Sequence, residues 1–360
     1  MREQVCFRPL LIIAAILLSC SAASAQAQKL EIVKIADGVY GAIFSEPRMD
    51  PVESNSLIVI GDDSVLVLDA NRTPATARAV IAEIRKLTHT PVRYVVNSHW
   101  HDDHIFGNQS YKEAFPQVEF IAHRNTREDM EKLAFPHIQG GINRFAKALS
   151  DTETQLKTGA KPNGEKLTEK ERAQLEEELK VYKDTLPKIK DIRLVLPTVT
   201  FDQRLTLYQG AREIQILYFG RGNTRGDVVV YLPREKILAT GDLLVHPVPF
   251  AYGSFLGEWI QSMKKMRELD AAVIMPGHGP LMRDKEYLDT VIALLESIVS
   301  QTQDAFKRGL SLEETRKAVN LESFRRRLAG DDAVRLDTFD DSIIRVGIER
   351  AYKEAKGELK

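Results

Sequence analysis

One short segment carries most of the information about this chain: Val92-Arg93-Tyr94-Val95-Val96-Asn97-Ser98-His99-Trp100-His101-Asp102-Asp103-His104. Its first residues are β-branched or aromatic, which predicts a buried strand. His99 and His101 follow two positions apart, so on extended backbone their side chains face the same way and can grip one ion. Asp103 and His104 come one step further round the turn, where they can hold a second ion. Imidazole with carboxylate is a ligand set that Zn²⁺ prefers, so this segment predicts a metal site.

Four further motifs flank residues 99–104, which we call the His/Asp loop. They are Val65-Leu66-Val67-Leu68-Asp69, Gly220-Arg221-Gly222-Asn223-Thr224, Leu238-Ala239-Thr240-Gly241-Asp242 and Met275-Pro276-Gly277-His278-Gly279-Pro280. Together, in this order, the five motifs resemble the signature of the metallo-β-lactamase-fold superfamily. One of them departs from the pattern, because Asn223 stands where the superfamily has a histidine.

The resemblance implies an α/β fold, a four-layer αββα sandwich with metal ions at one edge of its two sheets. It also implies a ligand set: His99, His101 and Asn223 at a first site; Asp103, His104 and His278 at a second; Asp242 bridging them. Asp103 would additionally be catalytic, orienting the nucleophile and shuttling its proton. Each ligating imidazole needs a partner for its other nitrogen, and Asp69 and Asp102 are two unranked candidates.

The chemistry follows from these ligands. A zinc-type ion lowers the pKa of bound water to about 7 and so supplies hydroxide at neutral pH. We expect one or two Zn²⁺ ions, with the second site the more secure, because the amide oxygen of Asn223 is a weaker donor than imidazole. Three consequences of Asn223 stay open: one ion held tightly at the second site, recruitment of another histidine, or loss of activity.

The expected activity is hydrolysis of an ester, thioester, lactone or lactam by metal-bound hydroxide, with β-lactams among the possible substrates. One alternative is a mononuclear iron oxidoreductase resembling the persulfide dioxygenases of the same fold. Those enzymes use as an iron ligand the histidine that Asn223 replaces, which counts against this alternative. The other is a metal-binding partner protein without turnover.

Three further side chains are candidates for substrate binding: His246, Arg221 and Arg225. Either arginine could bind a substrate carboxylate or pair with acidic side chains, and His246 could line the pocket, replace the missing ligand or be structural. Three aromatic residues could form an apolar wall or belong to the core: Tyr252, Phe255 and Trp259.

Composition restricts the partners of the chain. Of its 360 residues, Lys and Arg number 50 and Asp and Glu number 51, which leaves no field to attract nucleic acid or anionic membrane. A hydrophobic content of 43% is ample for a core. No segment beyond the N-terminus is long and apolar enough to span a bilayer. The partner that we expect is a small-molecule substrate.

The N-terminus has the pattern of a cleaved signal peptide, residues 1–25. Arg2 and Arg8 precede the apolar run Leu10–Leu18, and Ala23-Ser24-Ala25 offers a cleavage site. We therefore expect export, to the periplasm; the alternative is a lipoprotein anchored through Cys20, since Leu17-Leu18-Ser19-Cys20 loosely resembles a lipoprotein box.

The only two cysteines, Cys6 and Cys20, both lie in this segment. An exported chain would hold no disulfide and no thiolate metal ligand. This excludes resemblance to lactamase subclasses whose second zinc is held by Cys. Asp242 instead resembles the glyoxalase II-like and lactonase members.

Residues 29–300 are the expected metallo-β-lactamase-fold domain, with a helical insertion at 141–190 and a C-terminal helical extension at 301–360. Strand-like runs on either side of a turn predict a hairpin over 57–68, and an amphipathic pattern predicts a helix over 73–87. Further strand-like runs predict strands over 118–122 and between 191 and 240. A capping box at Thr168–Glu171 opens a helix that we expect Pro187 to end. We expect the insertion to be a helical hairpin lying across the sandwich near the His/Asp loop, either as a lid or as a surface excursion.

Overall fold

The computed structural model describes residues 29–44 and 53–359. The predicted signal peptide, the alternative anchor at Cys20 and the other cysteine lie outside these residues. Within them, none of the helices has both the length and the apolar character needed to cross a membrane.

Two sheets form the centre of the molecule. The first has seven strands in sequence order: β1 (Leu30–Ala36), β2 (Val39–Phe44), β3 (Ser56–Ile60), β4 (Val65–Leu68), β5 (Val92–Val96), β6 (Glu119–His123) and β7 (Val199–Phe201). The second has five, in the order β12 (Val273–Met275), β11 (Ile237–Ala239), β10 (Val228–Leu232), β9 (Arg212–Tyr218) and β8 (Arg204–Gln209). The predicted 57–68 hairpin is confirmed as the antiparallel pair β3 and β4.

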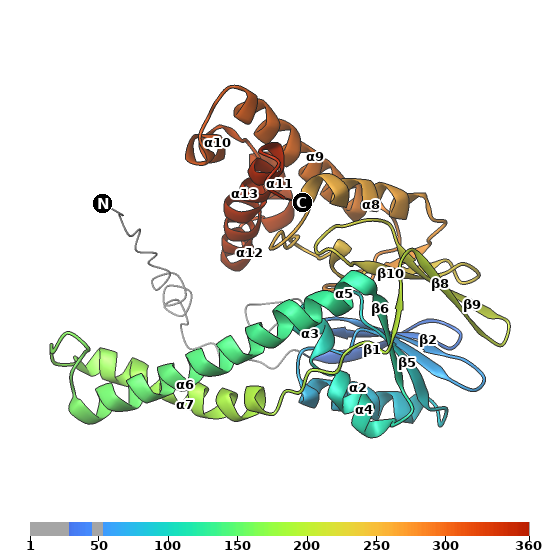
Figure 1. Ribbon diagram of the computed structural model, residues 1–360, viewed down its shortest axis with the longest axis horizontal. Coiled ribbons are helices and arrows are strands. Elements are labelled where there is room, and N and C mark those ends of the chain that lie inside the picture. The colour runs from blue at the N-terminus through green and yellow to red at the C-terminus, as the bar shows by residue number, and fades with distance from the viewer. Residues whose placement is uncertain (1–28, 45–52, 360) are drawn as a thin grey trace.

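Four layers result from the burial of both faces of each sheet. Residues such as Leu57, Leu68 and Val230 pack between the two sheets. On the outer face of the first sheet lie α2 (Pro74–Leu87) and α4 (Asn108–Ala114); on that of the second lie α8 (Leu256–Glu268) and α9 (Glu286–Lys307). The αββα sandwich is therefore confirmed (Figure 1).

The motif residues meet because of strand direction. β4 and β5 are parallel, as are β11 and β12. Asp69 follows β4, and the His/Asp loop with the short helix α3 (Asp102–Ile105) follows β5. The 3₁₀ turn η2 (Gly241–Leu243) follows β11, and His278 follows β12. Since the loops after two parallel strands lie at the same edge of their sheet, residues that are distant in sequence can share one site.

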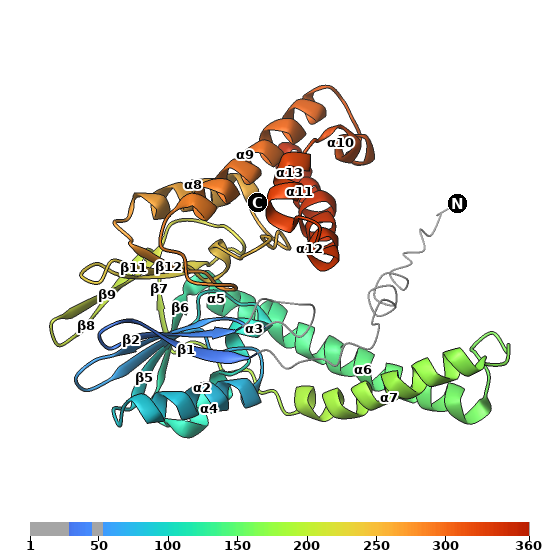
Figure 2. The same cartoon turned by 180° about the vertical axis from the view of Figure 1, so that it is seen from behind.

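The helical insertion forms a long arm. It begins with α5 (Arg124–Asp129) and the π-helix η1 (Met130–Ala134), continues as α6 (Phe135–Thr158) and returns as α7 (Glu169–Lys190). The hairpin and its capping box at Thr168 are confirmed. Two expectations were wrong: the helices begin before residue 141, and the hairpin extends away from the sandwich instead of lying across it (Figures 1 and 2).

The arm extends outward because its two helices pack mainly on each other. The rings of Phe145 and Tyr182 meet edge to face with their centroids 5.9 Å apart. Of the described side chains on α6 and α7, only Ile138, Thr152 and Leu186 are buried. Pro187 lies inside α7 and does not end it; because proline has no backbone N–H, the last part of the helix gives up one hydrogen bond.

The strands that we expected from residue 191 begin only at Val199. Residues 192–198 do not form a strand; Ile192, Leu194 and Leu196 pack against the base of the arm. A run of apolar residues can be extended without pairing when its side chains are buried in this way.

The C-terminal helices pack against α8 and α9 (Figure 1). They are α10 (Leu312–Ala318), α11 (Glu322–Ala329), α12 (Ala333–Thr338), the π-helix η3 (Phe339–Gly347) and α13 (Ile348–Ala355). Phe339 and Ile348 share one apolar cluster with residues of α8 and α9. The boundary proposed at residue 300 lies inside α9.

Candidate metal centre

Two groups of three potential ligands meet at the edge of the sheets. Within each group the ligand atoms lie within 4.8 Å of one another: His99, His101 and Asp242 form one, and Asp103, His104 and His278 the other. The structure thus brings together six of the seven predicted ligands, from three loops.

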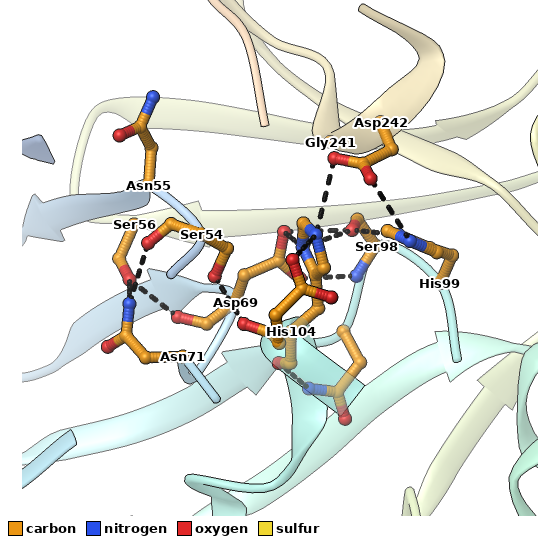
Figure 3. Close-up of polar contacts among 12 residues, drawn as sticks. Ser54, Asn55, Ser56, Asp69, Asn71, Ser98, His99, His104, Gly241 and Asp242 are labelled. Carbon is orange, nitrogen blue, oxygen red and sulfur yellow. Dashed lines mark hydrogen bonds and ion pairs between the residues drawn. The ribbon is translucent and has the colours of Figure 1, made fainter. Parts of the chain in front are cut away.

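Asp242 lies between the two groups. Its Oδ2 is 3.7 Å from Nε2 of His99, while its Oδ1 is 3.2 Å from Nε2 of His104 and 3.4 Å from Nε2 of His278 (Figure 3). On the other side of the second group, Asp103 Oδ2 is 3.0 Å from Nε2 of His278. One carboxylate is therefore within reach of both histidine clusters.

The donor atoms fit a metal ion. Nε2 of His99, His104 and His278 and Oδ1 of Asp242 are all buried, and none has a hydrogen-bond partner in the part of the chain that the structure describes. Buried polar atoms are nearly always hydrogen-bonded, so four exceptions directed at one place need an explanation. A cation coordinated by these atoms provides one.

The electrostatics of the centre agree with this fit. Burial lowers the pKa of His99 well below its usual value and also lowers the pKa of His101, so both imidazoles are neutral, the form that binds metal. Although burial opposes it, the adjacent His104 and His278 hold the pKa of Asp103 well below its usual value. Burial likewise opposes protonation of His104, but Asp242, Asp103 and Asp69 together raise its pKa well above the usual value. The three carboxylates around His104 thus favour a positive charge at the centre.

The structure ranks the two candidates for orienting the ligands. Asp69 Oδ2 lies 2.8 Å from Nδ1 of His104, and the same carboxylate accepts hydrogen bonds from the backbone N–H and the hydroxyl of Ser98 at 2.7 and 2.8 Å (Figure 3). Asp102 instead pairs with Arg72 at 3.4 Å and accepts the backbone N–H of Asp103. Asp69 is therefore the group that orients His104.

Two orienting contacts were missed in the sequence analysis. The hydroxyl of Ser98 lies 2.9 Å from Nδ1 of His99, and the carbonyl oxygen of Glu53 lies 3.0 Å from Nδ1 of His278. Ser98 is adjacent to the His/Asp loop and could have been considered. Glu53 could not, because it approaches His278 only through the fold.

Asn223 is fully buried, and neither its amide oxygen nor its amide nitrogen has a hydrogen-bond partner among the described residues. The residues around it are held firmly. Thr224 donates its backbone N–H to Oδ2 of Asp227 at 2.7 Å, and Gly222 donates to the carbonyl of Thr224 at 2.9 Å. Burial raises the pKa of Asp227 to about 7. No motif in the sequence had pointed to this residue.

The three candidate substrate-binding residues have other partners. Arg221 donates from Nε to both carboxylate oxygens of Glu258 at 3.0 Å. Arg225 donates in the same way to Asp129 at 3.2 Å. These ion pairs are the alternative that the sequence analysis left open for both arginines.

His246 donates its backbone N–H to the carbonyl of His278 and belongs to neither ligand group. Its ring lies 4.9 Å from that of Tyr287, with which it lines a cavity of about 290 Å³ that contains none of the predicted ligands. Of the three aromatic residues considered as an apolar wall, Trp259 and Phe255 belong to the core, and Tyr252 is 41% exposed.

An αββα sandwich with a His/Asp centre at its edge is the architecture of a metal-dependent hydrolase. The family model of the metallo-beta-lactamase superfamily matches residues 49–278, more than half of the chain. The protein therefore belongs to the metallo-beta-lactamase superfamily, and its two His/Asp groups could hold metal ions.

Particular relatives are distant. A linear primary-alkylsulfatase from Pseudomonas sp. (strain ATCC 19151) is 21% identical over 283 residues, which cover 72% of this chain and 48% of the relative. The chain thus spans about half the length of this relative. Among solved structures, a metallo-beta-lactamase from Pontibacter korlensis has a TM-score of 0.53 at 20% identity, covering 74% of this chain and 99% of that one. TMB-1 has a TM-score of 0.50 at 18% identity, covering 74% and 97%. At these identities the structural likeness shows the fold alone.

Proposed function

We propose that the protein is a zinc-dependent hydrolase of small molecules. The bond cleaved is that of an ester, thioester, lactone or lactam, with β-lactams possible; the name of the alkylsulfatase relative adds sulfate esters to the substrates to be tested. The observation that carries the proposal is the position of Asp242, within 3.7 Å of imidazole nitrogens from both ligand groups. A carboxylate shared in this way suits two adjacent cations.

The donor set supports zinc as the metal. It combines imidazole nitrogens with carboxylate oxygens, which zinc accepts readily, whereas magnesium and calcium prefer oxygen ligands alone. His99, His101 and Asp242 would hold one ion, with Asn223 as a further ligand; Asp103, His104 and His278 would hold the other. Zinc bound here would lower the pKa of a coordinated water to about 7.

Asp103 is assigned as the residue that orients the nucleophilic water. Its side chain is 14% exposed, whereas those of His104 and His278 are essentially inaccessible, so Asp103 lies on the side of the centre that water and substrate can reach. The histidines beside it depress its pKa strongly. A carboxylate that stays ionised accepts a hydrogen bond well, so Asp103 suits orienting the water better than storing its proton.

The proposal is tested by metal analysis and a substrate panel on one preparation of the full chain. The panel contains a β-lactam, a thioester, a lactone, a carboxylic ester and an alkyl sulfate, and each assay is repeated with Asp103→Asn. We expect one or two zinc ions per chain and hydrolysis of one class, lost in the variant. Bound iron with redox activity would favour the mononuclear iron alternative. Bound zinc without hydrolysis of any substrate would favour the binding protein without turnover.

The proposed location is the periplasm, after removal of residues 1–25. The mass of the chain recovered from the exporting cell tests this: a chain that begins at Gln26 is expected. A mass that includes a lipid on Cys20 would favour the anchored alternative.

A further inference from the structure

One short helical segment contacts two of the loops that carry potential metal ligands, the His/Asp loop and the loop of Asn223. This segment, α5 with η1, comprises residues 124–134 at the base of the arm. On one side it contacts residues 225 and 226, directly after Asn223 and Thr224. On the other it packs against the end of α3, which contains Asp103 and His104.

The contact with residues 222–226, which we call the Asn223 loop, is close and polar. The side-chain amide of Asn125 donates to the carbonyl of Arg225 at 2.9 Å, and the hydroxyl of Thr126 donates to the carbonyl of Gly226 at 2.8 Å. A Cβ at Gly226 would lie 2.7 Å from the backbone nitrogen of Thr126. Only glycine permits this approach, so the loop and α5 are fitted to each other.

A partly buried ion pair joins the same two elements. The side chain of Asp129 is only 5% exposed, and it faces Arg225, whose Nη2 is 2.5 Å from Oδ1 and whose Nε is 3.2 Å from each oxygen. Such a bidentate pair fixes orientation as well as distance. Removing Arg225 would leave the buried carboxylate of Asp129 without this cation, which is costly.

The other side of the segment is apolar. Met130 and Ala134 of η1 are buried against Ile105 and Phe106 at the end of α3. The position of α3, a helix of only four residues, depends on packing of this kind. The segment therefore spans the distance between the His/Asp loop and the Asn223 loop.

Asn223 needs such external support. Neither atom of its amide is hydrogen-bonded to the described residues, so only packing in its buried surroundings fixes the position of the side chain. As a ligand, an uncharged amide oxygen also binds a cation less strongly than a carboxylate would. The strength of the first site must then depend on how accurately the surrounding loop presents Asn223.

We propose that Asp129, acting through Arg225, is a positioning residue for Asn223 and thereby sets the metal affinity of the first site. The inference rests on the proposed function in taking Asn223 as a metal ligand. Asp129 does not touch the metal or the substrate. We expect its effect to fall mainly on the first site, because Arg225 lies two residues after Asn223, and the contacts of the segment with the end of α3 are made by Met130 and Ala134 and not by Asp129.

The experiment is a titration of the metal-depleted full chain with Co²⁺, followed by the visible absorption spectrum of each bound ion. Asp129→Asn removes the charge without changing the shape of the side chain, and Arg225→Gln removes the same pair from its more exposed side. We expect either substitution to weaken the first site by about 10- to 100-fold, as for other groups that orient ligands. The spectrum and affinity of the second site should stay as in the unmodified chain. Asp289→Asn, which breaks the exposed pair with Arg267 between α8 and α9, is the matched control.

A double substitution tests whether Asp129 acts through Asn223. In the Asn223→Ala background, Asp129→Asn should cause no additional loss of affinity at the first site. An additional loss there, an equal loss at both sites, or an unchanged first site in Asp129→Asn would overturn the inference. So would an unmodified chain that binds a single Co²⁺. An unmodified chain that binds no Co²⁺ would instead contradict the proposed function itself.

Discussion

Replacing Asp69 by asparagine should weaken the second metal site selectively. The buried carboxylate of Asp69 accepts two hydrogen bonds from Ser98 and lies 2.8 Å from Nδ1 of His104. In Asp69→Asn the side-chain oxygen can keep one acceptor position, but an NH₂ group must occupy the other. Asp69 has a φ of 64°, a left-handed conformation that asparagine adopts more readily than most residues. The backbone should therefore remain in place.

The size of the effect follows from the bonds that change. A hydrogen bond to a charged group contributes about 1.5 to 3 kcal/mol, and the asparagine NH₂ would face Nδ1 of His104 with a donor in place of an acceptor. Loss of that one bond at the second site corresponds to a fall in metal affinity of about 10- to 100-fold, the range typical of groups that orient ligands. The first site should change less, because it lacks His104.

A competition titration with a chromophoric zinc chelator measures both sites, and circular dichroism confirms that the variant is folded. Asp102→Asn is the matched control, because Asp102 is an aspartate in the loop of His104 but is 27% exposed and pairs with Arg72. A partly exposed pair contributes at most about 1 kcal/mol to stability, so its loss should leave both zinc affinities unchanged. Equal zinc affinities in Asp69→Asn and Asp102→Asn would refute the reasoning.

Three other predictions concern the loops and the arm. Burial raises the pKa of Asp227 from 3.8 to about 7, so its proton stabilises the metal-free fold fully below about pH 4, and this stabilisation is lost as the pH rises to 7. Urea unfolding should show the stability of Asp227→Asn relative to the unmodified chain shifting by about 4 kcal/mol between pH 4 and 7; parallel pH profiles would contradict this. Asn223→His should tighten the first site, measured by zinc titration, because imidazole is the stronger donor; unchanged affinity would mean that position 223 does not reach the ion. Replacing the outer part of the arm, residues 145–182, by a short linker should leave zinc affinity unchanged, because the outer arm packs mainly on itself; a rise in KM would restore the idea of a lid.

The sequence was sufficient to predict the six side chains that meet in the two ligand groups, because metal binding demands particular residue types at fixed local spacing. His99, His101, Asp103 and His104 lie within six residues, and each remaining ligand directly follows a strand or lies in a tight turn. The apolar strands and the capping boxes likewise depend on neighbours in sequence. Such local signals survive without knowledge of the fold.

Contacts made through the fold could not be predicted. Asp102 lies within the His/Asp loop and Asp69 ends a neighbouring motif, so either aspartate could orient a ligand. Only the path of β4 in the structure shows that Asp69 is the one that reaches His104. The pair of Asp129 with Arg225 joins residues 96 positions apart. The direction in which the arm extends could not be predicted either, because an amphipathic pattern indicates that a helix forms but not which element it packs against.

The most direct test of the central claim, that this edge of the sandwich binds zinc, is anomalous diffraction at the zinc edge from crystals of the zinc-loaded protein. The account predicts a strong peak about 2.0 to 2.2 Å from Nε2 of His104 and His278 and from a carboxylate oxygen of Asp103. A second peak, weaker because its occupancy is lower, should lie beside His99 and His101. Zinc bound elsewhere, with hydrogen-bonded water in place of a metal at these nitrogens, would contradict it.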